Sequence, residues 1–92
     1  MIRSFRHKGL QQLFETGKSA KVRPDHARRC LIILDALDKA PRAAAMVLPG
    51  LRFHPLKGSG AQRYAVDVSG PWRITFEWED ADAVRVDYEQ YH

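Results

Sequence analysis

The first part of the chain places apolar residues at helical spacing. Leu10, Leu13 and Phe14 fall on one face of a helix predicted over residues 8–16, and Gly17 is a typical C-terminal stop. Such a helix buries its apolar face and leaves the other face in water. The pattern therefore predicts a short amphipathic helix near the N-terminus.

A longer helix is predicted from Pro24–Asp25 to about Lys39, and Pro41 ends it. The apolar face of this helix consists of Ala27, Cys30, Leu31, Leu34 and Leu37. We expect one further helical turn over residues 43–47, before the turn signal Pro49-Gly50.

After that turn the hydrophobic period changes from 3.6 to 2. Three successive segments alternate, and their apolar positions are Tyr64, Val66 and Val68, then Trp72, Ile74, Phe76 and Trp78, then Val84, Val86 and Tyr88. Ser69-Gly70-Pro71 and the polar turn 79–82 connect the segments at lengths suited to hairpins. The pattern predicts an antiparallel meander, and Ile2–Phe5 is a candidate for a short edge strand.

These elements predict one α+β domain over residues 1–92, with two N-terminal helices packed on one face of a small, mostly antiparallel sheet. If the helices cover the face of Ile74 and Phe76, strand alternation points Arg73 and Thr75 to the opposite, open face. Polar groups from several strands can gather there, and we expect the chemistry on that face.

Composition excludes several broad classes. With 92 residues, 45% hydrophobic and 28% charged, the chain is typical of a globular domain rather than a disordered segment. A single cysteine, Cys30, cannot form an internal disulfide. The apolar runs, such as residues 30–34 and 43–48, are far shorter than the roughly 20 residues that span a bilayer. We therefore expect a cytoplasmic protein without a membrane partner.

Charge is distributed unevenly along the chain, whose formal net charge is +4. Residues 1–63 carry 13 Lys or Arg and 4 Asp or Glu, whereas residues 64–92 carry 2 and 7. A basic surface attracts polyanions such as nucleic acid. Because basic residues also serve solubility, this charge indicates only that a polyanion partner is possible.

Three segments carry residues suited to chemistry: His54–Gly58 in a loop before the meander, Trp72–Phe76 at a hairpin exit, and Tyr88–His92. A meander can bring all three to one end of the sheet. We expect a cationic and titratable cluster there, without an acid, made of His54, Lys57, Arg73, Tyr91 and His92. Arg binds phosphate through two N–H groups, Lys adds a compact charge, and His and Tyr exchange protons. The cluster therefore suits a phosphodiester substrate.

Each of these residues also has an ordinary structural explanation. Arg73 could form an ion pair with Glu77 or Glu89, the basic loop could be a solvated turn, and the C-terminal residues could fray. His7 and His26 are expected to be exposed residues at helix ends. The sequence has no Cys/His spacing typical of zinc sites and no paired-carboxylate motif, so we expect neither a metal nor another cofactor.

The sequence resembles the HigB-type toxins of the RelE superfamily, which belong to type II toxin–antitoxin systems. The resemblance covers essentially the whole chain and is carried by Met1–Leu10, Leu13-Phe14-Glu15, His54–Gly58, Trp72–Phe76 and Tyr91-His92. These toxins are small bacterial ribonucleases that cut mRNA on the ribosome. The resemblance implies mRNA in the ribosomal A site as the substrate and a helix-turn-helix antitoxin of the HigA type as a partner.

The resemblance also implies roles for individual residues. His54 and Lys57 match loop positions that contact mRNA and support cleavage. Arg73 matches a strand arginine near the scissile phosphate, and Tyr91 and His92 match a C-terminal pair used for stacking and hydrolysis.

The implied reaction is attack of a ribose 2′-OH on the adjacent phosphate, which gives a 2′,3′-cyclic phosphate and a 5′-OH without a metal. At pH 7 a histidine with an ordinary pKa of about 6.5 is mostly neutral, whereas a lysine with a pKa of about 10.4 is charged. To act as a base, Lys57 would need a neighbour such as Arg73 to lower its pKa. We therefore assign proton transfer to His54 or His92, charge stabilisation to Lys57 and Arg73, and RNA binding to these two cations and Arg63.

Some positions depart from the family. Pro71 stands where members often have Asn, and Gln90 stands where they often have Asp. Many members also have a basic residue on the strand where this chain has Asp67 or Ser69. Two other functions therefore stay open. One is a non-catalytic toxin of the same fold that binds a protein target such as gyrase, and the other is a degenerate toxin that binds but does not cut.

Overall fold

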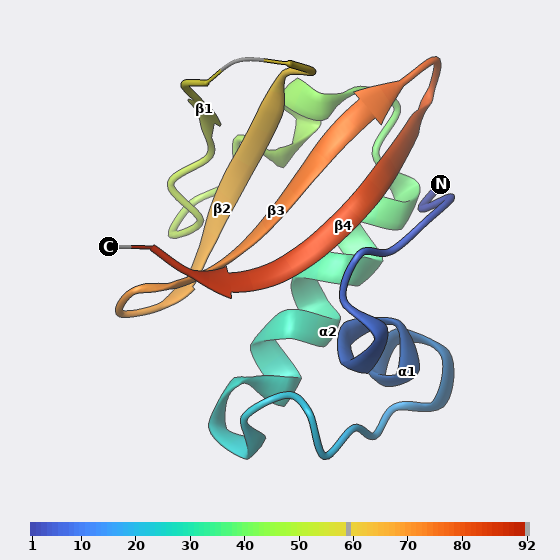
Figure 1. The fold of residues 1–92 in the computed structure, drawn as a ribbon, viewed down its shortest axis with the longest axis vertical. Coiled ribbons are helices and arrows are strands. Elements are labelled where there is room, and N and C mark those ends of the chain that lie inside the picture. The colour runs from blue at the N-terminus through green and yellow to red at the C-terminus, as the bar shows by residue number, and fades with distance from the viewer. Residues whose placement is uncertain (59, 92) are drawn as a thin grey trace.

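The computed structural model describes residues 1–58 and 60–91. Its elements in chain order are α1 (Lys8–Thr16), α2 (Pro24–Lys39), the 3-10 helix η1 (Ala43–Met46), β1 (His54–Leu56), β2 (Arg63–Ser69), β3 (Trp72–Glu79) and β4 (Asp82–Gln90). The four strands form one antiparallel sheet in the order β1-β2-β3-β4. Figure 1 shows this sheet as one layer with α2 behind it. The predicted α+β fold is thus confirmed, with the helices N-terminal to the strands.

The two predicted helices are present, and their ends follow from local chemistry. α1 begins where the Nδ1 atom of His7 accepts a hydrogen bond from the Leu10 N–H at 2.9 Å. It ends at Gly17, whose φ of 84° suits a residue without a side chain. Pro24 begins α2, because a proline costs no hydrogen bond in the first helical turn. Each of these signals involves neighbours in the chain, so each can be read from the sequence.

The predicted meander is present as β2, β3 and β4, and η1 is the expected extra helical turn. Two irregularities interrupt its pairing. The register shifts between Asp67 and Ser69, close to the β2–β3 turn, and again between Thr75 and Glu77 on β3. These shifts decide which side chains of neighbouring strands stand opposite one another.

The segment that was expected to be a loop before the meander forms a fourth strand. In β1, His54 pairs with Ala65 and Leu56 pairs with Arg63. Pro55 is tolerated there because β1 is an edge strand, and an edge strand leaves one side unpaired. The sequence did not predict this strand, because three residues are too few to show an alternation.

Two expectations about the N-terminal half are also wrong. Ile2–Phe5 does not form a strand, and only Ile2 and Phe5 make isolated parallel bridges to residues of β4. His26 is not exposed at a helix end. It is 4% exposed, and its Nδ1 atom lies 2.7 Å from the hydroxyl of Tyr88 on β4. This hydrogen bond lets a polar side chain lie on the apolar face of α2.

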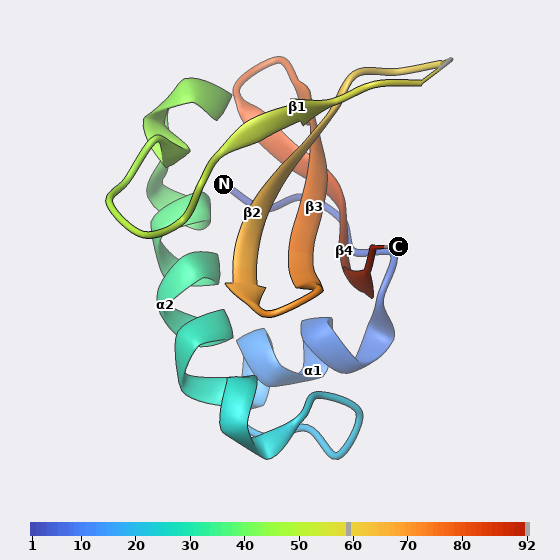
Figure 2. The same ribbon diagram turned by 90° about the vertical axis from the view of Figure 1, so that its left-hand side faces the viewer.

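The helices and one face of the sheet enclose the hydrophobic core, and Figure 2 shows α2 running along one side of the sheet. The largest fully buried side chains are Phe76, Leu10, Leu13, Ile33, Leu34, Leu37, Met46, Ile74, Val22, Val66, Val84 and Val86. Burial of a side chain of this size is worth roughly 1.5–3 kcal/mol. Because Ile74 and Phe76 point into this core, the residues between and beside them point to the opposite, open face.

Candidate functional site

The open face carries three rows of side chains, because residues that pair across antiparallel strands point to the same face. The first row is Asp67, Arg73 and Glu89, the second is His54, Ala65, Thr75 and Asp87, and the third is Leu56, Arg63 and Glu77. The first row lies beside the β2–β3 turn and the end of β4. The third row lies beside the loop that joins β1 to β2.

Arg73 lies in the first row with a side chain that is 17% exposed. Its Nη2 atom is 3.8 Å from Glu89 Oε1, which makes a loose ion pair. Its buried Nε–H has no hydrogen-bond partner among the described residues. An unpaired buried donor is costly, and a guanidinium with a free N–H group is suited to bind an anion. Arg73 is therefore the strongest candidate on this face for a contact with phosphate.

Tyr91 brings the C-terminal segment to the same row. Its backbone N–H donates to the carbonyl of Pro71 at 3.0 Å, which ties the segment to the β2–β3 turn. The Cζ atom of Arg73 lies 5.0 Å from the centre of the Tyr91 ring. Tyr91 is 37% exposed, so part of the ring is available for stacking. The predicted partner His92 lies outside the described residues.

The structure fixes which nitrogen of His54 can accept a proton. Nδ1 is 2.7 Å from the carbonyl oxygen of Arg52. Since a carbonyl only accepts hydrogen bonds, Nδ1 carries the hydrogen, and the lone pair of the neutral ring lies on Nε2. The half-buried His54 therefore presents a proton acceptor at Nε2.

Lys57 lies apart from Arg73. It follows β1 in an exposed loop, beyond the third row, beside a hollow of about 210 Å³ lined by residues 56–58 and 60–63. On β2, Asp67 in the first row is four residues beyond Arg63 in the third row. This separates the two rows by roughly 13 Å at about 3.3 Å per residue. The predicted residues thus do not form one compact cluster, and Arg73 is not the close neighbour that Lys57 was expected to have.

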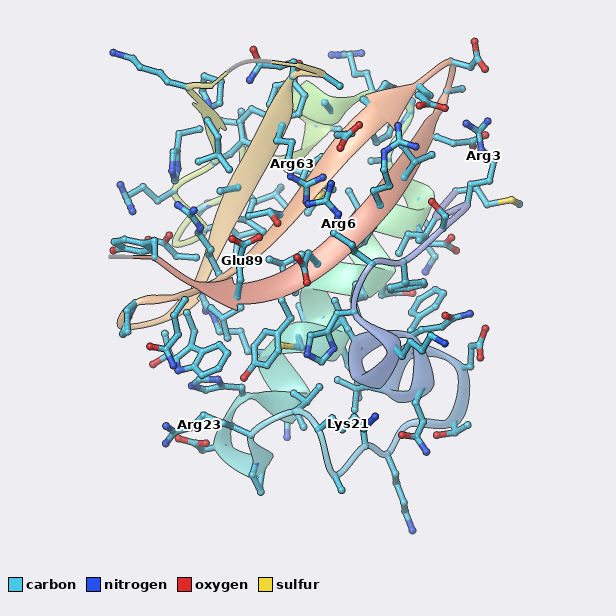
Figure 3. All side chains as sticks on the ribbon, viewed as in Figure 1. Arg3, Arg6, Lys21, Arg23, Arg63 and Glu89 are labelled. Atoms are coloured by element: carbon cyan, nitrogen blue, oxygen red, sulfur yellow. The ribbon has the colours of Figure 1, made fainter. Side chains whose placement is uncertain are left out.

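Arg63 is held by the sheet itself and is 16% exposed. Its Nη1 donates to Glu77 Oε2 at 2.8 Å. Its Nη2 donates to Thr75 Oγ1 at 2.8 Å and to the Arg85 carbonyl at 3.1 Å. Figure 3 shows Arg63 close to Arg6, which reaches the same oxygen of Glu77 at 3.7 Å. Burial acts to raise the pKa of Glu77, but hydrogen bonds from Arg85 and Arg63 outweigh it and hold the pKa below its ordinary value. The predicted contact of Arg63 with RNA stays a prediction.

Acidic residues share this face with the arginines, so the expectation of a cluster without an acid is wrong. Asp67 and Glu89 flank Arg73 in the first row. Glu89 Oε2 accepts a hydrogen bond from Thr75 Oγ1 at 2.7 Å, and its Oε1 faces Arg73. The alternation of the strands was enough to place these acids on the open face, but only the register shows that they flank Arg73.

Arg52 is a further residue at the site, and the sequence did not single it out. It lies two residues before His54, and its Nε donates to Asp67 Oδ2 at 2.7 Å. A hydrogen bond and charge attraction from Asp67 raise the pKa of Arg52, with smaller contributions from Tyr91. No local pattern marks this residue, because its position depends on the pairing of β1 with β2.

Within residues 1–58 and 60–91, no group of three or more His, Cys, Asp or Glu side chains is arranged to hold a metal ion. No helix in that part of the chain is long and apolar enough to cross a membrane. Cys30 is buried in the core, away from the open face.

Comparison with known proteins extends the sequence argument. The family model for HigB-like toxins, described as RelE-like toxins of type II toxin–antitoxin systems, matches residues 3–92. A protein of Proteus vulgaris named "Endoribonuclease HigB" is 38% identical over 92 residues, which cover 100% of both chains. The resemblance expected from the sequence motifs is therefore confirmed along the chain.

Proposed function

The chain belongs to the HigB-like toxins, which are RelE-like toxins of type II toxin–antitoxin systems, and on this premise we propose that it is an endoribonuclease that cleaves mRNA in the ribosomal A site. A relative that is 38% identical over the full chain is named an endoribonuclease. The observation that carries the proposal is that one face of the sheet carries three groups suited to this reaction, with Arg73 and Tyr91 side by side in the first row and His54 on β1 in the second row. The three groups are the free N–H of Arg73, the exposed ring of Tyr91 and the Nε2 lone pair of His54. Its place of action is then the cytoplasm, where ribosomes translate mRNA.

The reaction that suits these groups is a transesterification within the RNA. Nε2 of His54 takes the proton of a ribose 2′-OH, and the 2′-oxygen attacks the adjacent phosphorus. The bond to the 5′-oxygen of the next nucleotide then breaks, which leaves a 2′,3′-cyclic phosphate and a 5′-OH. We assign the proton for this leaving oxygen to His92. Negative charge that builds on the phosphate is stabilised by Arg73, and Lys57, at the other end of the open face, binds a different phosphate of the same RNA.

The charge of the open face supports dependence on the ribosome. Arginines from the first part of the chain are paired with acids from the last part: Arg3 with Glu79, Arg6 and Arg63 with Glu77, and Arg52 with Asp67. A face whose charges largely cancel attracts RNA phosphates weakly. The substrate then has to be delivered in an ordered form, as mRNA is in the A site, where Tyr91 stacks on one of its bases.

The partner that we propose for neutralisation is a helix-turn-helix antitoxin of the HigA type. Membership of a type II toxin family supports a protein antitoxin. Co-expression with such an antitoxin should restore growth that the toxin alone arrests. Continued arrest in cells that contain both folded proteins would contradict this partner.

Primer extension on an mRNA held in programmed ribosomes tests the activity, with the same mRNA free in solution as a parallel sample. We expect new 5′ ends within the A-site codon only when ribosomes are present. His54→Ala and Arg73→Lys should each slow cleavage by about 100- to 1,000-fold. Arg42→Lys is the matched control, because Arg42 is exposed on the connection after α2, and it should cleave like the wild type.

Each other outcome changes the function in a defined way. Equal cleavage of free mRNA would keep the ribonuclease and remove the ribosome. Absence of cleavage by folded protein that still arrests growth would favour a protein target such as gyrase. Absence of both cleavage and arrest would favour a degenerate toxin. Full activity of Arg73→Lys would show that the first row is not the reaction centre.

A further inference from the structure

Arg52 and Asp67 form a two-point ion pair at the edge of the first row. Arg52 Nε and Nη2 lie 2.7 and 3.3 Å from the two carboxylate oxygens of Asp67. The Arg52 side chain is 59% exposed and that of Asp67 is 23% exposed. An ion pair with so exposed an arginine contributes little to stability. Its fork geometry, however, is the one with which arginine binds phosphate.

The backbone holds Arg52 in this place. Its φ of 48° lies in the left-handed region, which is uncommon for a residue with a long side chain. Two hydrogen bonds of 2.7 Å maintain this conformation: the Asp67 N–H donates to the carbonyl of Leu51, and His54 Nδ1 donates to the carbonyl of Arg52. Unfavourable backbone angles that surrounding contacts maintain occur preferentially at functional sites. The position of Arg52 is thus coupled to the proton acceptor His54.

Asp67 links Arg52 to the row that contains Arg73. Arg73 lies over the Tyr91 ring, with Cζ 5.0 Å from its centre. Asp67 itself stands opposite Arg73 in the strand register while its side chain holds Arg52. A carboxylate thus binds one cation, Arg52, and stands opposite a second, Arg73, where a phosphate group would also be stabilised.

We propose that Arg52 binds a phosphate of the RNA backbone, and that Asp67 occupies its guanidinium until the RNA arrives. This inference rests on the proposed function, because it names a second phosphate contact for the same substrate. Two phosphate oxygens replace the two carboxylate oxygens on the arginine fork. Arg52 and Arg73 then contact phosphates on either side of the nucleotide that stacks on Tyr91.

Two substitutions with opposite effects separate this role from that of a structural ion pair. If phosphate competes with Asp67 for Arg52, Arg52→Gln weakens mRNA binding and Asp67→Asn strengthens it. If the pair only supports the fold, both substitutions act in the same direction. The double variant carries both substitutions and has no Arg52 guanidinium that the loss of the Asp67 charge could free. It should therefore bind mRNA as weakly as Arg52→Gln.

The measurement uses labelled protein and ribosomes programmed with an mRNA whose A-site riboses are 2′-O-methylated, so that no 2′-OH can attack. Binding to ribosomes without mRNA gives the part of the affinity that comes from contacts with the ribosome itself. From about 50 to 200 mM salt, Arg52→Gln should reduce the slope of log K against log salt by about 0.7, which is the value for one phosphate of a single strand. Asp67→Asn should raise the mRNA-dependent affinity several-fold.

Asp35→Asn is the matched control. Asp35 forms an exposed ion pair with Lys39 on α2 at 3.1 Å, so the control makes the same change in charge and breaks a similar pair away from the open face. We expect its mRNA-dependent affinity to equal that of the wild type. Thermal unfolding of each variant shows that it is folded under the binding conditions.

A loss of affinity in Asp67→Asn would overturn the proposal, as would unchanged binding by Arg52→Gln. An equal gain in Asp35→Asn would also overturn it, because net charge would then explain the effect. If wild-type protein gains no affinity from the mRNA and does not cleave an unmodified one, the proposed function fails together with this inference. If the wild type cleaves normally and Arg52→Gln binds normally, the inference alone fails.

Discussion

Tyr88→Phe removes a hydroxyl that joins the sheet to α2 inside the core. Tyr88 and His26 are each 4% exposed, and the hydroxyl lies 2.7 Å from His26 Nδ1. Phenylalanine keeps the ring and its stacking on Trp72, whose ring centre lies 4.6 Å away. The substitution therefore removes one hydrogen bond and leaves the buried His26 without its Tyr88 partner, while the packing changes little.

The expected cost follows from that loss. A buried polar group left without its partner lowers the free energy of unfolding by about 1–3 kcal/mol. In a domain of about this size each kcal/mol shifts Tm by about 4–8 °C, so Tm should fall by about 4–24 °C. In the Tyr88→Phe background, His26→Phe should lower the free energy of unfolding by less than it does in the wild type. In that background it also removes the ring nitrogen that Tyr88→Phe left without a partner.

Urea and thermal unfolding followed by circular dichroism measure both the loss and the coupling. Tyr88 pairs with Ile74 on the helix-covered face, whereas Arg73 lies on the open face. Cleavage at 25 °C, where the variant is still folded, should therefore stay close to that of the wild type. Strict additivity of the two substitutions, or an unchanged Tm, would refute the view that this hydrogen bond stabilises the core.

Other predictions test the site, the core and the effect of pH. Arg73→Ala should lower the cleavage rate by about 100- to 1,000-fold and abolish growth arrest in a protein that still folds; full toxicity of this variant would contradict the assignment. Because the pKa of Glu77 is lowered in the folded protein, its stabilising contribution is present above its unfolded pKa and is lost as pH falls through the folded pKa. The free energy of unfolding, measured with urea over a pH series, should therefore fall less steeply toward acid pH for Glu77→Gln than for the wild type. Burial raises the pKa of the Cys30 thiol to about 12, so iodoacetamide should label it only when the protein unfolds, and rapid labelling of native protein would contradict its position. Gly9→Ala should destabilise the fold by about 1–3 kcal/mol, because the added Cβ would collide with the side chain of Lys21 and lie 2.9 Å from His7 Cε1; equal urea midpoints would count against this close packing.

Local patterns were sufficient for the helices and the meander. The ends of α1 and α2 depend on residues within or next to each helix, and the strands of the meander show their alternation without reference to distant residues. β1 has no such pattern, since it forms because β2 offers an edge with which three residues can pair. The same limit explains the error at His26, whose partner Tyr88 is 62 residues away in the chain.

The site depends still more on distant pairing. The chemistry of His54, Arg73 and Tyr91 was enough to make them candidates, but their mutual position depends on the register of four strands and on two shifts in it. The register places Lys57 and Arg73 at opposite ends of the open face. It also places Asp67, which the sequence marked only as a departure from the family, directly opposite Arg73.

Arg73 and Arg52 differ in what a phosphate has to displace. The 3.8 Å separation between Arg73 Nη2 and Glu89 Oε1 is too long for a hydrogen bond, and the buried Nε has no partner among the described residues, so a phosphate that reaches the exposed part of this guanidinium has no short hydrogen bond to break. Arg52 already has both ends of its fork on Asp67, so a phosphate gains there only the difference between two similar contacts. Arg73 should therefore supply most of the binding and charge stabilisation. Arg52 should add a smaller contribution, which grows when Asp67 loses its charge.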